Sequence, residues 1–303
     1  MTSITDLVGN TPLIEIPHPN QDKVSVFAKC EWYNPSGSVK DRAAANMVQD
    51  ALEKGQLDGK ILIDATSGNT GIAYAMIGAA LQIPVELALP ENASEERKLI
   101  LKNYGVTLHL TSAMEGTDGA QRAVKQIVED NPDKYFYPDQ YNNDNNWRAH
   151  YNHTGPEIWA QTDHSVTHFV AGLGTTGTFC GTSKFLQEKG VTCIAVHPDN
   201  PMHGLEGWKH METAIVPGIY DNTIADQNAE VSTEKAFQYA KAATQYLGLM
   251  ISPSAAANLV VALETAAALE SGVVVTVFPD NAMKYLKDPF WSDDAYHIEN
   301  PFI

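Results

Sequence analysis

The stretch KILIDATSGNTGIAYAMIGAALQIPVELAL, residues 60–89, decides the fold. Residues 60–66 are a short apolar run typical of a buried strand, residues 71–81 carry the small and apolar side chains of a buried helix, and residues 84–89 form a second apolar run. A strand, a helix and a strand in succession predict two parallel strands joined by a crossover helix.

The same alternation continues on both sides of this stretch. Ser94 is placed to cap a helix that ends at Gly105, and a strand is expected at 106–110. Further strands are expected at 166–171, 192–197 and 273–278. The pattern predicts an α/β fold of two subdomains with mostly parallel sheets flanked by helices.

The segment 141–153, rich in Asn and His, is the most polar interruption of the pattern. We expect it to be a loop and a hinge between the two subdomains. His150 and His153 are then solvated loop histidines in preference to metal ligands.

Composition excludes several classes of function. The chain has 303 residues, of which 44% are hydrophobic, so a sizeable core is expected. A formal net charge of -17 argues against binding to nucleic acid or to an anionic membrane surface. Cys30, Cys180 and Cys193 lack the spacing of a disulfide framework or a zinc site, so no metal is expected. With no secretory signal and no long apolar run, a cytoplasmic location is expected.

The segment NPSGSVKDR, residues 34–42, precedes a helical pattern and contains a candidate nucleophile. Ser38 is expected to cap the helix, with Asp41 reciprocating as in a capping box. Lys40 then lies in the first turn, where the helix dipole and Arg42 both favour its neutral amine. A lysine that attacks an aldehyde needs that form. An ordinary solvated lysine explains this segment equally well.

The segment TSGNTG, residues 66–71, joins the first strand to its helix. Its glycines allow a ligand to approach the backbone, and the free N–H groups of a helix start bind anions such as a carboxylate or phosphate. An ordinary turn with Thr70 as the helix cap is the alternative.

The segment GLGTTG, residues 172–177, matches the GxGxxG pattern of dinucleotide-binding proteins, and Asp199 follows a later strand. A dinucleotide-dependent dehydrogenase is therefore an alternative function. The hydroxyls of Thr175, Thr176 and Thr178 suit a terminal phosphate better than a bridging pyrophosphate. The dehydrogenase interpretation also leaves Lys40 without a role.

Taken together, these segments resemble the fold-type II pyridoxal-phosphate (PLP) enzymes, which are similar to the tryptophan synthase β chain. The closest resemblance is to the cysteine synthase (O-acetylserine sulfhydrylase) family of the B type. It runs from LVGNTPL at 7–13 to about Leu286, and it includes DQYNN at 139–143 and TGPEIW at 154–159.

The resemblance implies a role for particular residues. Lys40 would bind PLP covalently and act as the catalytic base. Cofactor contacts are implied for Asn69, Gly174, Thr175, Thr176, Gly177, Thr178, Ser252 and Asp280, with residues 174–178 as a phosphate cup and Asp280 at the pyridine nitrogen. Substrate contacts are implied for Thr66, Ser67, Gly68, Asn69, Thr70 and Gln140.

The resemblance also implies an organisation and a reaction. A large subdomain (1–37 and 147–290), a smaller mobile subdomain (38–146) and a tail (291–303) are expected. O-acetylserine would lose acetate and gain sulfide to give cysteine. Alternatives within the fold are a cystathionine β-synthase and a serine or threonine dehydratase. An inactive scaffold that binds serine acetyltransferase is the alternative that is not an enzyme.

Partners and surface features complete these expectations. A homodimer is implied, and serine acetyltransferase is a candidate partner. Glu206 stands where B-type members carry arginine, which predicts a preference for sulfide over thiosulfate. The tail is polar and ends in Phe302 and Ile303. These two residues are proposed to fold over an active-site mouth, and the alternative is a frayed or surface-packed terminus.

Overall fold

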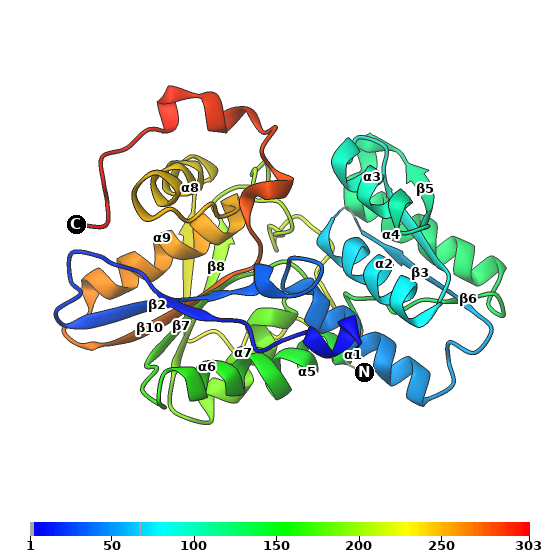
Figure 1. The fold of residues 1–303 in the computed structure, drawn as a ribbon, viewed down its shortest axis with the longest axis horizontal. Helices are drawn as coiled ribbons and strands as arrows, with labels where there is room; N and C mark the ends of the chain where they lie inside the picture. Colours follow the sequence, from blue (N-terminus) through cyan, green and yellow to red (C-terminus); the bar gives the residue numbers. More distant parts are fainter. Residues whose placement is uncertain (1–2, 67) are drawn as a thin grey trace. The chain divides into compact units, whose positions relative to one another are not determined.

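The computed structural model describes residues 3–66 and 68–303, and the chain divides into two compact units (Figure 1). The first unit comprises Met1–Val8 and Asn34–Asn146, and the second comprises Gly9–Tyr33 and Trp147–Ile303. The segment up to Val8 and residues 34–37 therefore belong to the first unit, whereas the sequence-based division placed both in the larger subdomain. For residues 34–37 the reason is local, because the N–H of Ser36 donates to Asp41 in the helix that follows.

The first unit is built on a four-stranded parallel sheet in the order β5-β4-β3-β6. Its strands are β3 (Ile61–Ala65), β4 (Val85–Pro90), β5 (Thr107–Thr111) and β6 (Tyr135–Phe136), and its helices are α1 (Lys40–Glu53), α2 (Asn69–Leu81), α3 (Glu95–Asn103) and α4 (Gly116–Asp130). Alternate residues of β3 point to opposite faces, so Leu62 packs with α1 and α2 while Ile63 packs with α4. The predicted βαβ unit is confirmed by the parallel pairing of β3 and β4.

The second unit is built on a six-stranded sheet in the order β1-β2-β10-β7-β8-β9, in which only the β1–β2 pair is antiparallel. Its strands are β1 (Leu13–Glu15), β2 (Val24–Cys30), β7 (His168–Gly172), β8 (Thr192–Pro198), β9 (Gln227–Val231) and β10 (Gly272–Phe278), and its helices are α6 (Gly155–Gln161), α7 (Gly177–Gln187), α8 (Thr233–Leu247) and α9 (Pro253–Ala268). Helix α5 (Asp144–Ala149) contains the boundary between the two units.

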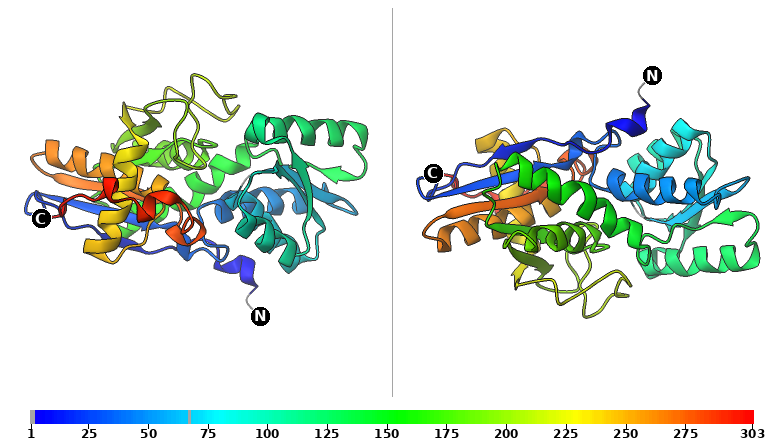
Figure 2. Two further views of the ribbon diagram at one scale, coloured as in Figure 1. Left: turned by 90° about the horizontal axis from the view of Figure 1, so that it is seen from above. Right: turned by 90° about the horizontal axis from the view of Figure 1, so that it is seen from below.

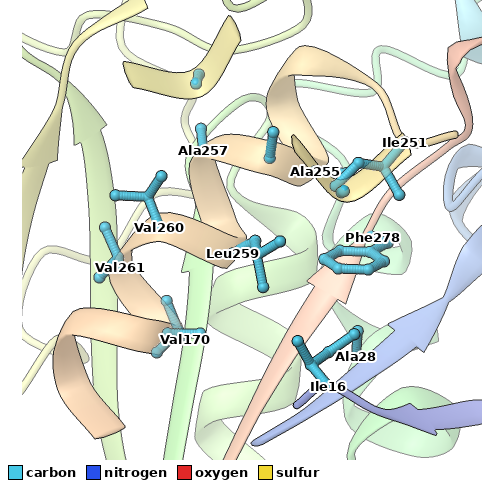
Figure 3. Close-up of a cluster of buried hydrophobic side chains, with 14 of the residues drawn as sticks. Ile16, Ala28, Val170, Ile251, Ala255, Ala257, Leu259, Val260, Val261 and Phe278 are labelled. Atoms are coloured by element: carbon cyan, nitrogen blue, oxygen red, sulfur yellow. The ribbon is translucent and has the colours of Figure 1, made fainter. Parts of the chain in front are cut away.

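The core of the second unit has two layers, one on each face of its sheet. Val170 and Val274 pack under α9 with Val260, whereas Phe169 and Val275 pack on the other face with α7. Figure 3 shows the first layer, where Leu259 and Val260 of α9 lie above the strands. Figure 2 shows from above and below that α8 and α9 lie on one face of the sheet and α6 and α7 on the other. The expected α/β class is confirmed.

The polar segment 141–153 is largely helical, contrary to the loop expected from its composition. It forms α5 and enters a π-helical turn, His150–Thr154. His150 is 1% exposed because its ring packs against α7, where Gly181 leaves room for it. The prediction of a solvated His150 is therefore wrong, and His153 is exposed as expected.

The C-terminal segment packs on the second unit. Phe302 is 2% exposed and belongs to the same core layer as α8 and α9, with Tyr239 of α8 against its ring edge. Tyr246 of α8 also donates to the carbonyl of Ile298. The proposal that Phe302 is available to cover an active-site mouth is therefore wrong, because a buried aromatic ring gains more from the core than from solvent. Ile303 is exposed.

Among residues 3–66 and 68–303, no helix is both long and apolar enough to cross a membrane. Within the same ranges, no three His, Cys, Asp or Glu side chains gather in a way that could hold a metal ion.

Candidate active site

Lys40 is the first residue of α1, and its side chain is half-buried. The residue before it, Val39, occupies the cap position without a side-chain hydrogen bond, and the Ser38 hydroxyl accepts from the N–H of Lys40 at 3.3 Å. The Asp41 carboxylate accepts from the N–H of Ser36 at 2.6 Å and from the Ser36 hydroxyl. The expected capping box is therefore wrong, because Asp41 fixes the turn before the helix. Lys40 therefore lies at the positive end of the α1 helix dipole.

The loop between β3 and α2 has a structure set by Thr66. Its hydroxyl oxygen accepts from the N–H of Gly68 at 3.2 Å and from the N–H of Gly71 at 3.3 Å. Gly68 occupies the cap position and Asn69 begins the helix, so the interpretation of Thr70 as the cap is wrong. The prediction for Ser67 lies outside the described residues. The loop therefore leads directly into the start of α2 at Asn69, where helix backbone N–H groups lie beside small polar residues.

Gln140 lies against this loop. Its side-chain oxygen accepts from the Thr70 hydroxyl at 2.8 Å, and its side-chain N–H donates to the carbonyl of Ala65 at 3.0 Å. Gln140 and Thr70 are 3% and 4% exposed. Asn146 in turn donates to the Gln140 carbonyl at 2.6 Å. The structure thus brings together two segments that the sequence assigned separately to the substrate carboxylate.

A basic residue that sequence reasoning missed also lies at this loop. A Cβ added to Gly68 would lie 3.4 Å from a terminal guanidinium nitrogen of Arg97 in α3, and Arg97 is 4% exposed. A buried cation beside this loop adds to its attraction for anions. Its place in a helix of ordinary amphipathic pattern gave no local sign of this contact.

In the second unit, the GxGxxG segment joins β7 to α7 as expected. Thr176 precedes the helix in a left-handed conformation, with a φ of 72°. Its buried hydroxyl oxygen has no hydrogen-bond partner within residues 3–66 and 68–303. A Cβ on Gly174 would lie 2.2 Å from the Gly207 carbonyl oxygen, so only glycine fits there. The loop around Gly207 therefore covers the cup.

Thr178, in the first turn of α7, contacts the buried His150. The hydroxyl of Thr178 and Nε2 of His150 are 3.3 Å apart, and Nδ1 of the same ring lies 2.9 Å from the Thr154 hydroxyl. The ring therefore connects the TGPEIW segment to the cup. Sequence reasoning missed this role because it assigned His150 to a loop.

Asp280 follows β10, and Ser252 directly precedes α9. Asp280 is 1% exposed, and the hydroxyl of Tyr285 donates to its Oδ2 at 2.8 Å. Ser252 caps α9 by accepting from the N–H of Ala255 at 3.2 Å, and its hydroxyl lies 3.1 Å from that of Ser254. Tyr285 was not predicted, and its spacing from Asp280 gave no sign of the contact.

These residues fit the three polar parts of PLP. The orphaned buried hydroxyl of Thr176 beside the helix start of α7 suits a phosphate group. A buried carboxyl such as that of Asp280 suits a protonated pyridine nitrogen. A neutral lysine amine suits the aldehyde. Lys40 and Asn69 lie in the first unit, and the cup, Ser252 and Asp280 lie in the second.

The chain belongs to the pyridoxal-phosphate dependent enzyme family, whose sequence profile matches residues 4–280. It is therefore an enzyme that uses PLP, and the dinucleotide-dependent dehydrogenase interpretation of residues 172–177 is wrong.

The most informative relatives are cysteine synthases. The chain is 49% identical over 302 residues to a cysteine synthase of Aquifex aeolicus, covering 96% of this chain and 92% of that protein. It is 35% identical to cysteine synthase B of Salmonella typhimurium, covering 98% of each. The crystal structure of a cysteine synthase from Entamoeba histolytica superposes with a TM-score of 0.92 at 33% identity, covering 97% of this chain and 91% of that one.

Proposed function

We propose that this enzyme is a cysteine synthase, a transferase that replaces the acetate of O-acetyl-L-serine by sulfide to give L-cysteine. The observation that carries the choice among PLP-dependent reactions is the similarity to the cysteine synthase of Aquifex aeolicus, which extends over nearly the whole chain. The hydrogen bond between Thr70 and Gln140 supports it, because both residues are expected to bind the substrate carboxylate.

The loop from Thr66 to Thr70 binds and orients the substrate. Backbone N–H groups at the start of α2 donate to the substrate carboxylate, whereas the Thr70 hydroxyl donates its only proton to Oε1 of Gln140 and so orients the Gln140 side chain beside this loop. Arg97 beside Gly68 contributes a positive charge. Binding at this loop favours closure of the smaller subdomain and exclusion of water.

The residues that would hold the cofactor are those that the resemblance implies. Thr175, Thr176 and Thr178 with the backbone at the start of α7 would hold the phosphate, Asp280 would pair with the pyridine nitrogen, Lys40 would bind the aldehyde and Asn69 would contact the ring. When bound, PLP withdraws electrons from the substrate Cα. Tyr285 donates to Asp280 and so keeps that carboxyl oriented.

Lys40 moves the proton of the reaction. Its neutral amine takes the proton from Cα as the β-carbon to oxygen bond breaks and acetate leaves with the bonding electrons. Sulfide then forms the new bond to the β-carbon, and the Lys40 ammonium returns its proton to Cα. The place of Lys40 at the helix start supports this role, because the dipole there lowers the cost of a neutral amine.

A homodimer and serine acetyltransferase as a partner are part of this proposal. The sulfur donor is sulfide in preference to thiosulfate. Glu206 supports this preference because it is exposed in the loop whose Gly207 carbonyl covers the cup.

The test is the identity of the product. The purified enzyme is given O-acetylserine with sulfide, O-acetylserine alone, and serine with homocysteine, and the products are separated and quantified. We expect cysteine to form fastest from the first mixture. Pyruvate as the main product would indicate a dehydratase, and cystathionine from the third mixture at a higher rate would indicate a cystathionine β-synthase; either result overturns the proposal.

A further inference from the structure

A buried acid lies directly beneath the carboxylate-binding loop. Asp64 is 0% exposed in β3, two residues before Thr66. Its Oδ1 accepts from the N–H of Ala65 at 2.7 Å, whereas its Oδ2 is buried and has no hydrogen-bond partner within the described ranges. An ionised carboxylate with an unpaired buried oxygen is unstable in a protein interior, so a proton on this group removes most of the cost.

The groups around Asp64 are tyrosines, backbone amides and other acids. The Tyr74 hydroxyl of α2 and the backbone N–H of Gln140 both stabilise the charged form of the Asp64 carboxyl. Neither of them makes a well-aligned hydrogen bond to Oδ2. Asp139 acts on it through its charge. Tyr137 faces both acids, and none of the groups that perturb Asp64 is a cation.

Asp139 itself is part of the same strained cluster. It adopts a left-handed conformation with a φ of 49°, and its Oδ2 accepts from the Asn142 side chain at 2.8 Å. The Tyr137 hydroxyl acts on the Asp139 carboxyl, although neither the hydroxyl nor Oδ1 makes a well-aligned hydrogen bond in the described part of the chain. Tyr141 completes the cluster and also faces Asp118 of α4. Three acids thus surround the tyrosines, so ionisation of Asp64 adds to an existing negative charge.

Burial is the largest cause that raises the pKa of Asp64, and the charge of Asp139 adds to it. The N–H of Ala65, the Tyr74 hydroxyl and the Gln140 backbone amide lower it, and the resulting pKa is about 7. The side chain therefore changes its charge near neutral pH.

Asp64 is connected to the substrate loop through two residues. The Ala65 carbonyl accepts from the Gln140 side chain at 3.0 Å, and Gln140 accepts from Thr70 at 2.8 Å. We infer that Asp64 is a positioning residue for the carboxylate-binding loop, and that a proton on its buried side chain keeps this loop competent to bind an anion. When that proton leaves, the new negative charge repels the substrate carboxylate and disturbs Gln140. This inference rests on the proposed function of the loop.

The kinetic test compares the wild-type enzyme with Asp64→Asn between pH 6 and 9. The quantity compared is the KM of the wild type for O-acetylserine divided by the KM of Asp64→Asn. In this ratio the ionisation of the substrate itself cancels, because it affects both enzymes equally. We expect this ratio to rise several-fold with a midpoint near pH 7, while the ratio of kcat values stays nearly constant. Asp50→Asn, at a half-buried acid of α1 that pairs with Lys54, is the control and should track the wild type at every pH. Equal pH profiles for the wild type and Asp64→Asn would overturn the inference.

Tyr74→Phe is the second variant, which guards against a fold defect in the first. The Tyr74 hydroxyl lowers the pKa of Asp64, so its removal should move the midpoint of the KM rise to higher pH. An unchanged or lower midpoint contradicts the inference. The dissociation constant of L-serine is measured over the same pH range from the change in visible absorption of bound PLP. This measurement needs no turnover, so it still tests the loop if O-acetylserine is not the substrate.

Unfolding gives a readout that does not depend on the reaction. The pKa of Asp64 is higher in the folded state than the ordinary value of about 4, so the folded state binds more protons between about pH 4 and 7. The contribution of this group to stability therefore falls as pH rises through that window and is constant above it. In Asp64→Asn the free energy of unfolding should no longer show this decrease between about pH 4 and 7. An unaltered pH dependence of urea unfolding in the variant would show that Asp64 does not carry the proton.

Discussion

The hydroxyl of Thr70 donates to Oε1 of Gln140 at 2.8 Å and joins two segments that are 70 residues apart in the chain. This bond holds the hydroxyl in one rotamer beside the start of α2. Thr70→Val keeps the shape of the side chain and removes the donor. We expect KM for O-acetylserine to rise about ten-fold, because one lost hydrogen bond corresponds to about 1.4 kcal/mol, with a smaller change in kcat.

The matched control for this change is Thr265→Val on α9, where the hydroxyl donates only to the carbonyl one turn before it. That variant should retain the wild-type KM. A Thr70→Val enzyme with unchanged KM would show that the Thr70–Gln140 hydrogen bond does not contribute to substrate binding.

Lys40→Ala should leave a folded protein that makes no cysteine. Lys40 is only half-buried at a helix start, so its removal creates no cavity. We expect the visible absorption of covalently bound PLP to disappear and cysteine formation to fall at least a thousand-fold, a loss of about 4 kcal/mol in transition-state stabilisation.

Lys54→Ala, at the other end of the same helix, removes an exposed lysine that pairs with Asp50 and should retain full activity. Wild-type rates of cysteine synthesis in Lys40→Ala would refute the central role of this residue.

Asp280→Ser should retain PLP but slow the reaction. The carboxyl is buried and oriented by Tyr285, which suits a partner for a protonated pyridine nitrogen, and loss of acetate needs only a moderate electron sink. We expect kcat to fall a few-fold at an unchanged ratio of bound PLP to protein, measured by absorbance. Tyr285→Phe, which keeps the carboxyl and removes its hydrogen-bond donor, should lower kcat less than Asp280→Ser does. Loss of PLP from Asp280→Ser would exclude this electronic role.

Glu206 lies in the loop that covers the cup and predicts which sulfur donor is used. A carboxylate there repels the dianion thiosulfate more than it repels monoanionic hydrosulfide. At equal concentrations the initial rate with sulfide should exceed that with thiosulfate, and Glu206→Arg should raise the relative rate with thiosulfate. Glu212→Arg, an exposed residue of the same unit, makes the same charge change as a control. Faster turnover of thiosulfate by the wild type would reverse this conclusion.

Much of the fold follows from local patterns in the sequence. The strand at 61–65, its helix and the strand at 85–90 were predicted because apolar runs and helical periodicity are local properties. The position of residues 66–71 and 172–177 between a strand and a helix was predicted for the same reason, and the glycines and hydroxyls there favour anion binding.

The rest depends on contacts between distant residues. The burial of His150 requires Gly181 of α7, and Arg97 of α3 lies beside Gly68 at the start of α2. Neither pairing is visible in a segment of sequence taken alone. Asp64 shows the same limit, because its raised pKa comes from burial and from Asp139, 75 residues further on in the chain.

Phe302 provides the last test, of the C-terminal segment. Its ring is 2% exposed in the core layer under α8, and Tyr239 contacts its edge. Phe302→Ala removes this buried ring and should lower the free energy of unfolding by about 3 kcal/mol, the lower end of the range for a core phenylalanine because a terminal segment can partly collapse into the space. Urea unfolding measures this loss. KM for O-acetylserine should stay at the wild-type value, because the ring packs in the core instead of covering a substrate.

Ile303→Ala, at a side chain that is 87% exposed, is the control and should change neither quantity. A lower KM in Phe302→Ala together with unchanged stability would restore the interpretation of this segment as a competitor of the substrate.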